Sequence, residues 1–301
     1  MSKAKSAPDK ASATGYIIAA ALVKLAGEPK WSQYFTPDMR MLNSAFARFA
    51  KDSLVKSVID WLSAGLAVWL MDNLFVRGLM HHYIFRKRYI EEQVRRAIAA
   101  GTTQIINLGA GFDTLSLRLA KEFPQVRFIE IDRSVTQATK IRVLQQIGYG
   151  VPANVAFVFA DLAQTSVAAA LSTNNSANPA LASLIVLEGV LMYLSGSEVE
   201  TLFKDLRAYF QSRLTIVFGA LAPTKQRDDA SVKAINSMLS HGHEEPKWVC
   251  ASKNMPQFVA AQGYILSEWV GYKQLQRLYL PEDAIRKVPE EDENYYIIEK
   301  Q

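Results

Sequence analysis

The chain has 301 residues, of which 50% are hydrophobic and 21% are charged, so it can bury a sizeable core as one large α/β domain or as a domain with an added cap. Its formal net charge of +5 comes from scattered basic residues, several of them beside acids, which favours a solvated surface and no nucleic-acid partner. The single cysteine, Cys250, excludes an intrachain disulfide and a cysteine-based zinc site. It is consistent with a reducing, cytoplasmic location.

Two segments resemble targeting or membrane elements without meeting their requirements. Residues 1–14 are rich in Lys, Ser and Ala but lack the pattern of a signal peptide, so we expect a flexible leader. Residues 58–76 are apolar, yet their uncharged run is far shorter than the roughly 20 residues that a membrane span needs. We therefore expect no membrane span here, and favour a buried helix in a cap or a homodimer contact over a membrane-surface element.

The order of expected elements divides the chain into two parts. Residues 15–100 carry helical apolar spacing over 16–25, 45–79 and 86–100, which predicts a helical cap. In 101–301, short β-rich runs alternate with helical patterns. The expected strands are 104–108, 127–131, 155–159, 183–187, 215–218, 265–270 and 295–298.

The alternation predicts an α/β fold: a Rossmann-like, seven-stranded, mostly parallel sheet with helices on both faces, preceded by the N-terminal helical cap. Residues 223–256 follow the fifth strand as a long, polar, helical-looking insertion. We expect this insertion to form a lid over a substrate.

A glycine turn follows the first expected strand. The segment QIINLGAGFDTLSLRLA reads as a strand, a turn and a helix, with Gly109 and Gly111 where the backbone curls tightly and can approach a ligand. A lone Gly-x-Gly is weak evidence, because glycine at such a turn often serves only the turn. The third glycine of a dinucleotide site is absent, since Thr114 stands there directly after Asp113.

Acidic residues follow the next three strands at the edge where ligands of open α/β sheets bind. Asp132, about twenty residues after the glycine turn, is placed to accept both ribose hydroxyls of an adenosine, with Glu130 as the alternative acid on the same strand face. Asp161 suits the adenine amino group, and Leu162 offers a backbone N–H and an apolar contact to the ring. Glu188 follows the fourth strand. Each acid could instead cap a helix, but together they favour a nucleotide site.

The segments QIINLGAGFDTLSLRL, FIEIDRSVTQATK, FADL and LEGVLMYLS, in this order and spacing, resemble the leucine carboxyl methyltransferase family, including its bacterial branch of polyketide-type O-methyltransferases. The resemblance covers about residues 15–220 and implies a class I methyltransferase that uses S-adenosylmethionine. It leaves the acceptor open, because residues 221–301 match no motif of the branch that methylates a protein C-terminal leucine. The N-terminal segment SATGYIIAAALVKLAGEP is more similar to the bacterial branch, which favours a small-molecule acceptor.

The resemblance also implies roles for individual residues. An arginine on the helix before the first strand holds the methionine carboxylate of the cofactor, and this role falls on Arg86, with Arg88 as the competitor. The family usually has Arg-Thr where this chain has Arg86-Lys87. Further implied contacts are Glu188 to the amino-acid portion, Asp132 to the ribose, Asp161 and Leu162 to the adenine, and Gly109, Ala110 and Gly111 along the cofactor.

Methyl transfer to oxygen needs different residues for different acceptors. A carboxylate acceptor needs no catalytic base, whereas a hydroxyl needs one within hydrogen-bond reach. Tyr193 and His241 are the candidate bases, and Tyr193 could equally be a core residue. His241 and His243 lack a clear carboxylate partner, and His81 and His82 face different sides of a helix, so we expect no metal site.

The leading hypothesis is an S-adenosylmethionine-dependent O-methyltransferase acting on a carboxylate or hydroxyl of a small molecule. A protein C-terminal carboxyl methyltransferase remains open as the first alternative. An NAD-dependent oxidoreductase shares the glycine turn and the ribose acid but not the third glycine, and a non-catalytic scaffold would retain the fold alone.

Overall fold

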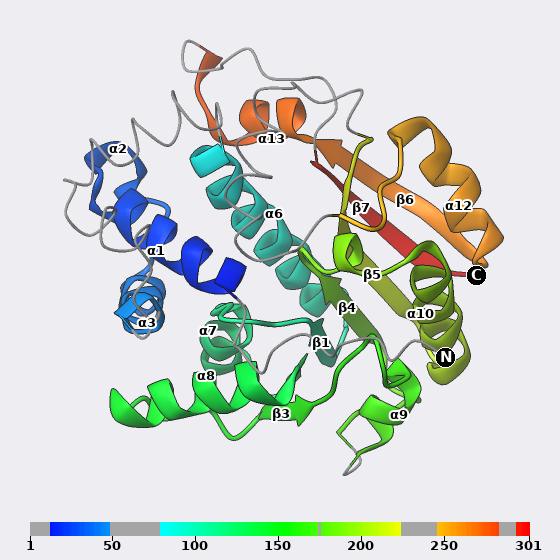
Figure 1. The fold of residues 1–301 in the computed structure, drawn as a ribbon, viewed down its shortest axis with the longest axis horizontal. Coiled ribbons are helices and arrows are strands. Elements are labelled where there is room, and N and C mark those ends of the chain that lie inside the picture. Colours follow the sequence, from blue (N-terminus) through cyan, green and yellow to red (C-terminus); the bar gives the residue numbers. More distant parts are fainter. Residues whose placement is uncertain (1–12, 49–78, 174–175, 224–245, 283–292) are drawn as a thin grey trace, which may run out of the picture.

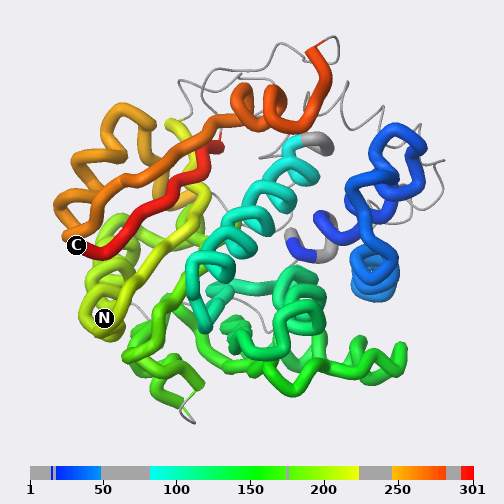
Figure 2. The backbone as a smooth tube through the Cα atoms, turned by 180° about the vertical axis from the view of Figure 1, so that it is seen from behind, coloured from blue at the N-terminus to red at the C-terminus, as the bar shows by residue number. Residues whose placement is uncertain are grey.

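The computed structural model describes residues 13–48, 79–173, 176–223, 246–282 and 293–301. Its first helices are α1 (Ala13–Gly27), α2 (Pro29–Ser32) and α3 (Pro37–Arg48), which lie together beside the long helix α6 (Leu79–Ala99) (Figures 1 and 2). Most of the expected leader, most of the expected helix 45–79 and residues 224–245 of the expected lid lie outside the described residues. Among the described residues, no helix combines the length and apolar character needed to cross a bilayer.

The sheet has seven strands in the order β3-β2-β1-β4-β5-β7-β6. The strands are β1 (Gln104–Leu108), β2 (Arg127–Asp132), β3 (Val155–Phe159), β4 (Ser183–Leu187), β5 (Leu214–Leu221), β6 (Tyr264–Gly271) and β7 (Glu293–Lys300). Strands β1 to β5 pair in parallel, and β7 lies antiparallel between β5 and β6. The predicted α/β fold with a mostly parallel seven-stranded sheet is confirmed, and the three last strands are longer than expected.

Helices cover both faces of the sheet because the strands are apolar on both sides. In β1, Ile105 packs with α6, α7 (Leu115–Glu122) and α13 (Tyr272–Tyr279), whereas Ile106 packs on the opposite face. That opposite face carries α9 (Val167–Ser172), α10 (Gly196–Tyr209) and α12 (Met255–Ala261), and α8 (Ser134–Gln146) packs near α3 at the β3 edge. Burial on both faces was expected for β3 too, but β3 is the edge strand and Phe159 is exposed.

The connections direct every parallel strand towards the same edge. Helix α6 ends at Ala99, and β1 begins three residues after Gly101, whose φ of 90° is the left-handed conformation common just beyond helix ends. The short turns after β1, β2 and β4 therefore meet at the carboxyl edge of the sheet. Strand β7 begins at that edge, since Glu293 pairs with Leu221 at the end of β5.

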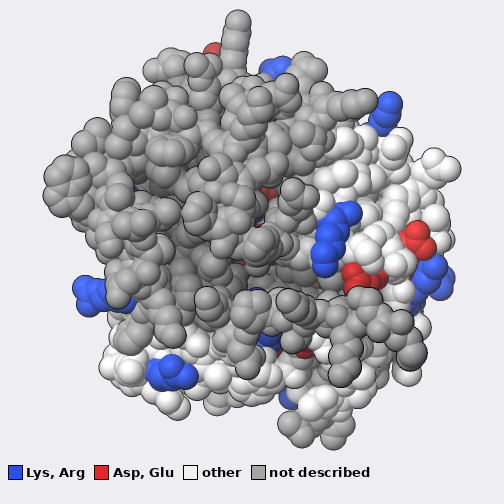
Figure 3. All heavy atoms as spheres, in the orientation of Figure 1, with Lys and Arg blue, Asp and Glu red and all other residues white. Residues whose placement is uncertain are grey.

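On the described part of the face in Figure 3, basic and acidic side chains lie near one another.

A fully buried ion pair joins β2 to α8. The Nζ atom of Lys140 lies 2.6 Å from Oε2 of Glu130 and also donates to the carbonyl of Asp113, at 2.6 Å. Both charged side chains are 0% exposed. Burial raises the pKa of Glu130, and the ammonium of Lys140 opposes that shift. Glu130 is thus a packing residue, and its role as the alternative ribose ligand is wrong.

We predict that Lys140→Met lowers the free energy of unfolding by about 3–5 kcal/mol, because it leaves a buried carboxyl group without its cation. Chemical denaturation followed by circular dichroism measures the loss. The double variant Lys140→Met/Glu130→Gln is the matched control and should recover part of it. A loss under about 1 kcal/mol in the single variant would contradict this account.

Candidate active site

The glycine turn joins β1 to α7 at the carboxyl edge of the sheet. Gly109 and Gly111 have φ values of 67° and 48°, a region that glycine adopts without strain. A Cβ atom at Gly109 would clash with the side chain of Val190 in the loop after β4. Beside Gly111, a Cβ atom would come no nearer than 4.0 Å to the atoms found around it, so this side of the turn is open. The turn therefore packs on one side and can approach a ligand on the other.

Asp132 is the last residue of β2 and lies directly against this turn. Its Oδ2 accepts a hydrogen bond from the N–H of Gly111 at 2.6 Å, and its Oδ1 accepts one from the N–H of Arg133 at 2.7 Å. Each carboxylate oxygen keeps a further lone pair, because a carboxylate accepts about four hydrogen bonds. The side chain is thus fixed in position while able to accept hydroxyl donors.

Asp161 lies two residues beyond the end of β3 and is partly exposed. Its carboxylate accepts hydrogen bonds from the N–H of Ala163 at 3.0 Å and from the side-chain amide of Gln164 at 3.1 Å. Leu162 packs against the core cluster on the α10 face of the sheet. Since β1, β2 and β3 are adjacent and parallel, Asp132 and Asp161 follow neighbouring strands at one edge.

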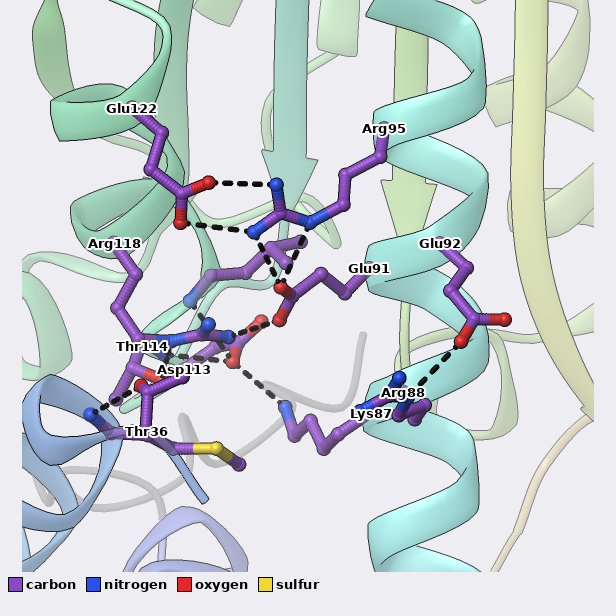
Figure 4. A network of polar contacts seen from close by, with 12 residues as sticks. Thr36, Lys87, Arg88, Glu91, Glu92, Arg95, Asp113, Thr114, Arg118 and Glu122 are labelled. Atoms are coloured by element: carbon purple, nitrogen blue, oxygen red, sulfur yellow. Dashed lines mark hydrogen bonds and ion pairs between the residues drawn. The ribbon is translucent and has the colours of Figure 1, made fainter. Parts of the chain in front are cut away.

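Glu188 follows β4 and binds two cations of α6. Its Oε1 lies 2.8 Å from Nε of Arg86 and 2.9 Å from Nζ of Lys87. Lys87 also reaches Oδ1 of Asp113 at 2.9 Å, a contact drawn in Figure 4. Arg88, the competing arginine, is about half exposed and pairs with Glu92 on its own helix. The structure therefore brings Arg86, and not Arg88, to Glu188.

Glu293, the first residue of β7, extends this cluster along the sheet edge. Its Oε2 lies 3.3 Å from NH1 of Arg86 and 2.7 Å from Nε2 of His82, and the Tyr295 hydroxyl lies 2.9 Å from the same His82 nitrogen. Arg86 thus bridges Glu188 on β4 and Glu293 on β7. His82, Arg86 and Glu293 are each less than one-tenth exposed.

The electrostatics of the cluster keep all of its charges in place. Burial opposes ionisation of Asp113, yet the ammonium of Lys87 outweighs it and holds the pKa of that carboxyl well below its usual range. Burial likewise opposes ionisation of Glu293, but Arg86 and His82 lower its pKa to about 2. Burial would lower the pKa values of Arg86 and Lys87, but the carboxylates around them raise both. The carboxylates of Asp113, Glu188 and Glu293 therefore gather around Arg86 and Lys87, and Lys140 and Arg118 add positive charge near Asp113.

Sequence reasoning did not assign Lys87, His82 or Glu293 to the site. The signal for His82 is its spacing of four residues from Arg86, which puts both side chains on one face of α6. The signal for Glu293 is the period of two that places it beside Tyr295 on β7. Neither signal names the partner, because the partners are more than 200 residues apart along the chain.

Of the candidate bases and metal ligands predicted from the sequence, some lie in the described residues and some outside them. Tyr193 ends the short helix η3 (Leu191–Tyr193) after β4 and so follows Glu188 at the same edge. His241 and His243 lie outside the described residues. Within the described ranges, no group of three or more His, Cys, Asp or Glu side chains is arranged to hold a metal ion.

These residues fit the cofactor that the resemblance implies. S-adenosylmethionine carries an α-ammonium, a carboxylate and a sulfonium, with one net positive charge. The Arg86–Glu188 pair offers one partner of each sign to the amino-acid portion. The open side of Gly111 and the fixed carboxylate of Asp132 lie at the neighbouring strand ends, where a nucleoside can be held.

The family model of leucine carboxyl methyltransferase matches residues 41–207, which is more than half of the chain. This chain belongs to the leucine carboxyl methyltransferase family. The family predicted from the sequence is thereby confirmed. The match covers α6, the glycine turn and the edge residues up to Glu188, but not Glu293.

Relatives and solved structures agree with the family. A candidate S-adenosyl-L-methionine-dependent methyltransferase of Frankia alni is 27% identical over 54% of this chain and 57% of its own length. One of Streptomyces avermitilis is 24% identical over 61% of this chain and 68% of its own. A candidate methyltransferase structure from Thermobifida fusca aligns with a TM-score of 0.62 at 18% identity, covering 95% of this chain and 94% of that one, which shows the shared fold. The match to the Frankia protein thus spans little more than half of that relative.

The low pKa of Glu293 makes part of the stability of the protein acid-sensitive. A carboxyl whose pKa is about 2 in the folded chain and 4.5 ordinarily stabilises the fold above about pH 4.5, and this contribution is lost as pH falls towards 2. We predict that Glu293→Gln is less stable at neutral pH but loses less stability between pH 6 and pH 3. Denaturant titrations of both proteins across this range measure the difference, and parallel curves would contradict the assigned pKa.

Proposed function

We propose that this protein transfers a methyl group from S-adenosylmethionine to a carboxylate or hydroxyl oxygen of a small-molecule acceptor. The observation that carries the proposal is the buried cluster at the carboxyl edge, where Arg86 and Lys87 share Glu188. Family membership and the names of the relatives support the donor. They do not choose among acceptors.

In the proposed site each residue holds a chemically matched part of the cofactor. Arg86 takes the methionine carboxylate, and Glu188 takes the α-ammonium by exchanging part of its contact with Arg86 and Lys87. The nucleoside lies along Gly109, Ala110 and Gly111, with its ribose hydroxyls on Asp132. Its adenine faces Asp161 and Leu162.

The bound sulfonium supplies an electrophilic methyl group, so the chain mainly has to align it with the acceptor oxygen and exclude water. The alignment comes from side chains that the network fixes before binding, such as Asp132 and Glu188. The edge above β4 and β5 also receives the described end of the expected lid, because the N–H of Lys247 donates to the carbonyl of Met192 and the N–H of Cys250 donates to that of Leu221. We propose that residues 223–256 close over the acceptor there and that 15–100 form the cap.

The structure also bears on the alternative functions. The absent third glycine is explained by packing, since Thr114 is the N-cap of α7 and is 2% exposed. A pyrophosphate beside it would face the ionised Asp113, which disfavours NAD. A cytoplasmic enzyme that forms a homodimer remains part of the proposal, as does the less favoured methylation of a protein C-terminal carboxylate.

We predict that S-adenosylhomocysteine binds the purified protein and that Asp132→Ala weakens its binding about 10- to 100-fold, the magnitude expected for lost hydrogen bonds to a charged group. Isothermal titration calorimetry with S-adenosylhomocysteine and with NAD measures the affinities. Glu200→Ala, on the exposed face of α10, is the matched carboxylate control and should leave the affinity unchanged. Binding of NAD alone, or equal affinity of wild type and Asp132→Ala, would refute the proposed site.

A further inference from the structure

His82 is the buried side chain at the carboxyl edge that the cofactor roles above leave unused. It lies one helical turn before Arg86 on α6 and is 5% exposed. Its ring packs edge-on against Tyr272 of α13, with centroids 4.9 Å apart, and tilted against Tyr295 of β7. The imidazole is therefore held by three elements, α6, α13 and β7.

The contacts of the ring determine which nitrogen carries its proton. Nε2 of His82 lies 2.7 Å from Oε2 of Glu293. Glu293 is ionised at neutral pH, because Arg86 and His82 outweigh the effect of burial and lower its pKa to about 2. A carboxylate oxygen and an unprotonated ring nitrogen at this distance would be two acceptors facing each other, so Nε2 must be the donor. In the neutral tautomer that keeps this proton, the lone pair is on Nδ1.

The second ring nitrogen of His82, Nδ1, has no role in holding the described fold together. Nδ1 of His82 is buried and makes no hydrogen bond to any described residue. An orphaned polar atom in such a place is costly, and it indicates a partner that binds there. The arrangement of a carboxylate on one ring nitrogen and a free lone pair on the other is that of a histidine base oriented by an acid.

His82 lies beside the proposed cofactor cluster, on the side of β5 and β7. Arg86 joins Glu293 to Glu188, so the His82–Glu293 pair continues the cofactor cluster by one ion pair. Glu293 pairs with Leu221 at the end of β5, so the ring belongs to the region above β5 and β7, whereas the proposed nucleoside contacts follow β1, β2 and β3.

We propose that His82 is the general base of this enzyme, that Glu293 positions it, and that the acceptor is a hydroxyl with a proton to lose, such as a phenol or an enol. The inference rests on the proposed O-methyl transfer and narrows its acceptor class. A carboxylate acceptor is already ionised, so a general base would have no proton to remove from it.

The reaction balances with these groups alone. The acceptor O–H gives its proton to Nδ1, the oxygen forms a bond to the methyl carbon, and the C–S bond breaks with its electron pair remaining on sulfur. The products are a methyl ether, a thioether and an imidazolium, whose charge Glu293 balances. The proton returns to solvent when the products leave. The groups that face the ring are Glu293 and Tyr295 of β7, Tyr272 of α13 and Tyr83 of α6, and Arg86 of α6 pairs with the same Glu293.

The protonation of the ring tests the inference without any acceptor. Nitrogen-15 NMR of histidine-labelled wild-type protein, with His82→Gln used to assign the signal, should show the proton on Nε2 and an unprotonated Nδ1 at the pH of activity. Glu293→Gln should shift this tautomer balance. A ring that carries its proton on Nδ1 in the wild type would overturn the inference.

The dependence of the methyl-transfer rate on the acceptor tests the inference through catalysis. With 4-methoxyphenol, which is not ionised at pH 8, His82→Gln should lower kcat/KM about 100-fold or more, the usual contribution of a general base. With 4-nitrophenol, which is ionised at that pH, the loss in His82→Gln should be at least about tenfold smaller, because no proton has to be removed. Imidazole should restore part of the rate of His82→Gly with 4-methoxyphenol.

Two further results would separate the inference from the proposed function. Equal losses with both phenols would mark His82 as a structural residue and overturn the inference, while methyl transfer itself would stand. Turnover of benzoate in place of both phenols would also overturn it. If S-adenosylhomocysteine does not bind the wild type, the proposed function fails, whatever the NMR result.

Discussion

The ion pair between Arg86 and Glu188 is the contact on which the arrangement of the site depends. It joins a helix that precedes the sheet to the tip of the central strand β4, and a second contact of Arg86 reaches Glu293 on β7. Buried charges of this kind are tolerated only when they are paired, so each partner fixes the others. The carboxyl edge is consequently rigid in its polar residues before any ligand is bound.

The arrangement concentrates charged groups in a region with little access to water. The carboxylates of Asp113, Glu188 and Glu293 gather around Arg86 and Lys87, so a ligand that carries both an ammonium and a carboxylate finds a partner of each sign. Lys87 contributes directly, because it divides its ammonium between Glu188 and Asp113.

Most of the fold could be predicted from the sequence, as could the place of three acidic residues at the carboxyl edge of the sheet. The strands were predictable because β1 and β4 are short apolar runs, and Asp132, Asp161 and Glu188 were predictable because each follows such a run. The prediction of Glu130 as the alternative ribose ligand was wrong. The period of two along a strand predicts which face of the sheet Glu130 lies on, but it does not reveal that Lys140 pairs with it there. His82 and Glu293 could not be paired, because their contact depends on β7 inserting between β5 and β6, which no local pattern reveals.

A crystal structure of the protein with S-adenosylhomocysteine tests the central claim most directly. Our account predicts the amino-acid portion between Arg86 and Glu188, the ribose hydroxyls within hydrogen-bond distance of Asp132, and the His82–Glu293 pair intact beside the thioether. A ligand bound elsewhere would contradict it. So would a bound ligand that contacts neither Arg86 nor Glu188 and leaves the Arg86–Glu188 and Arg86–Glu293 pairs unchanged.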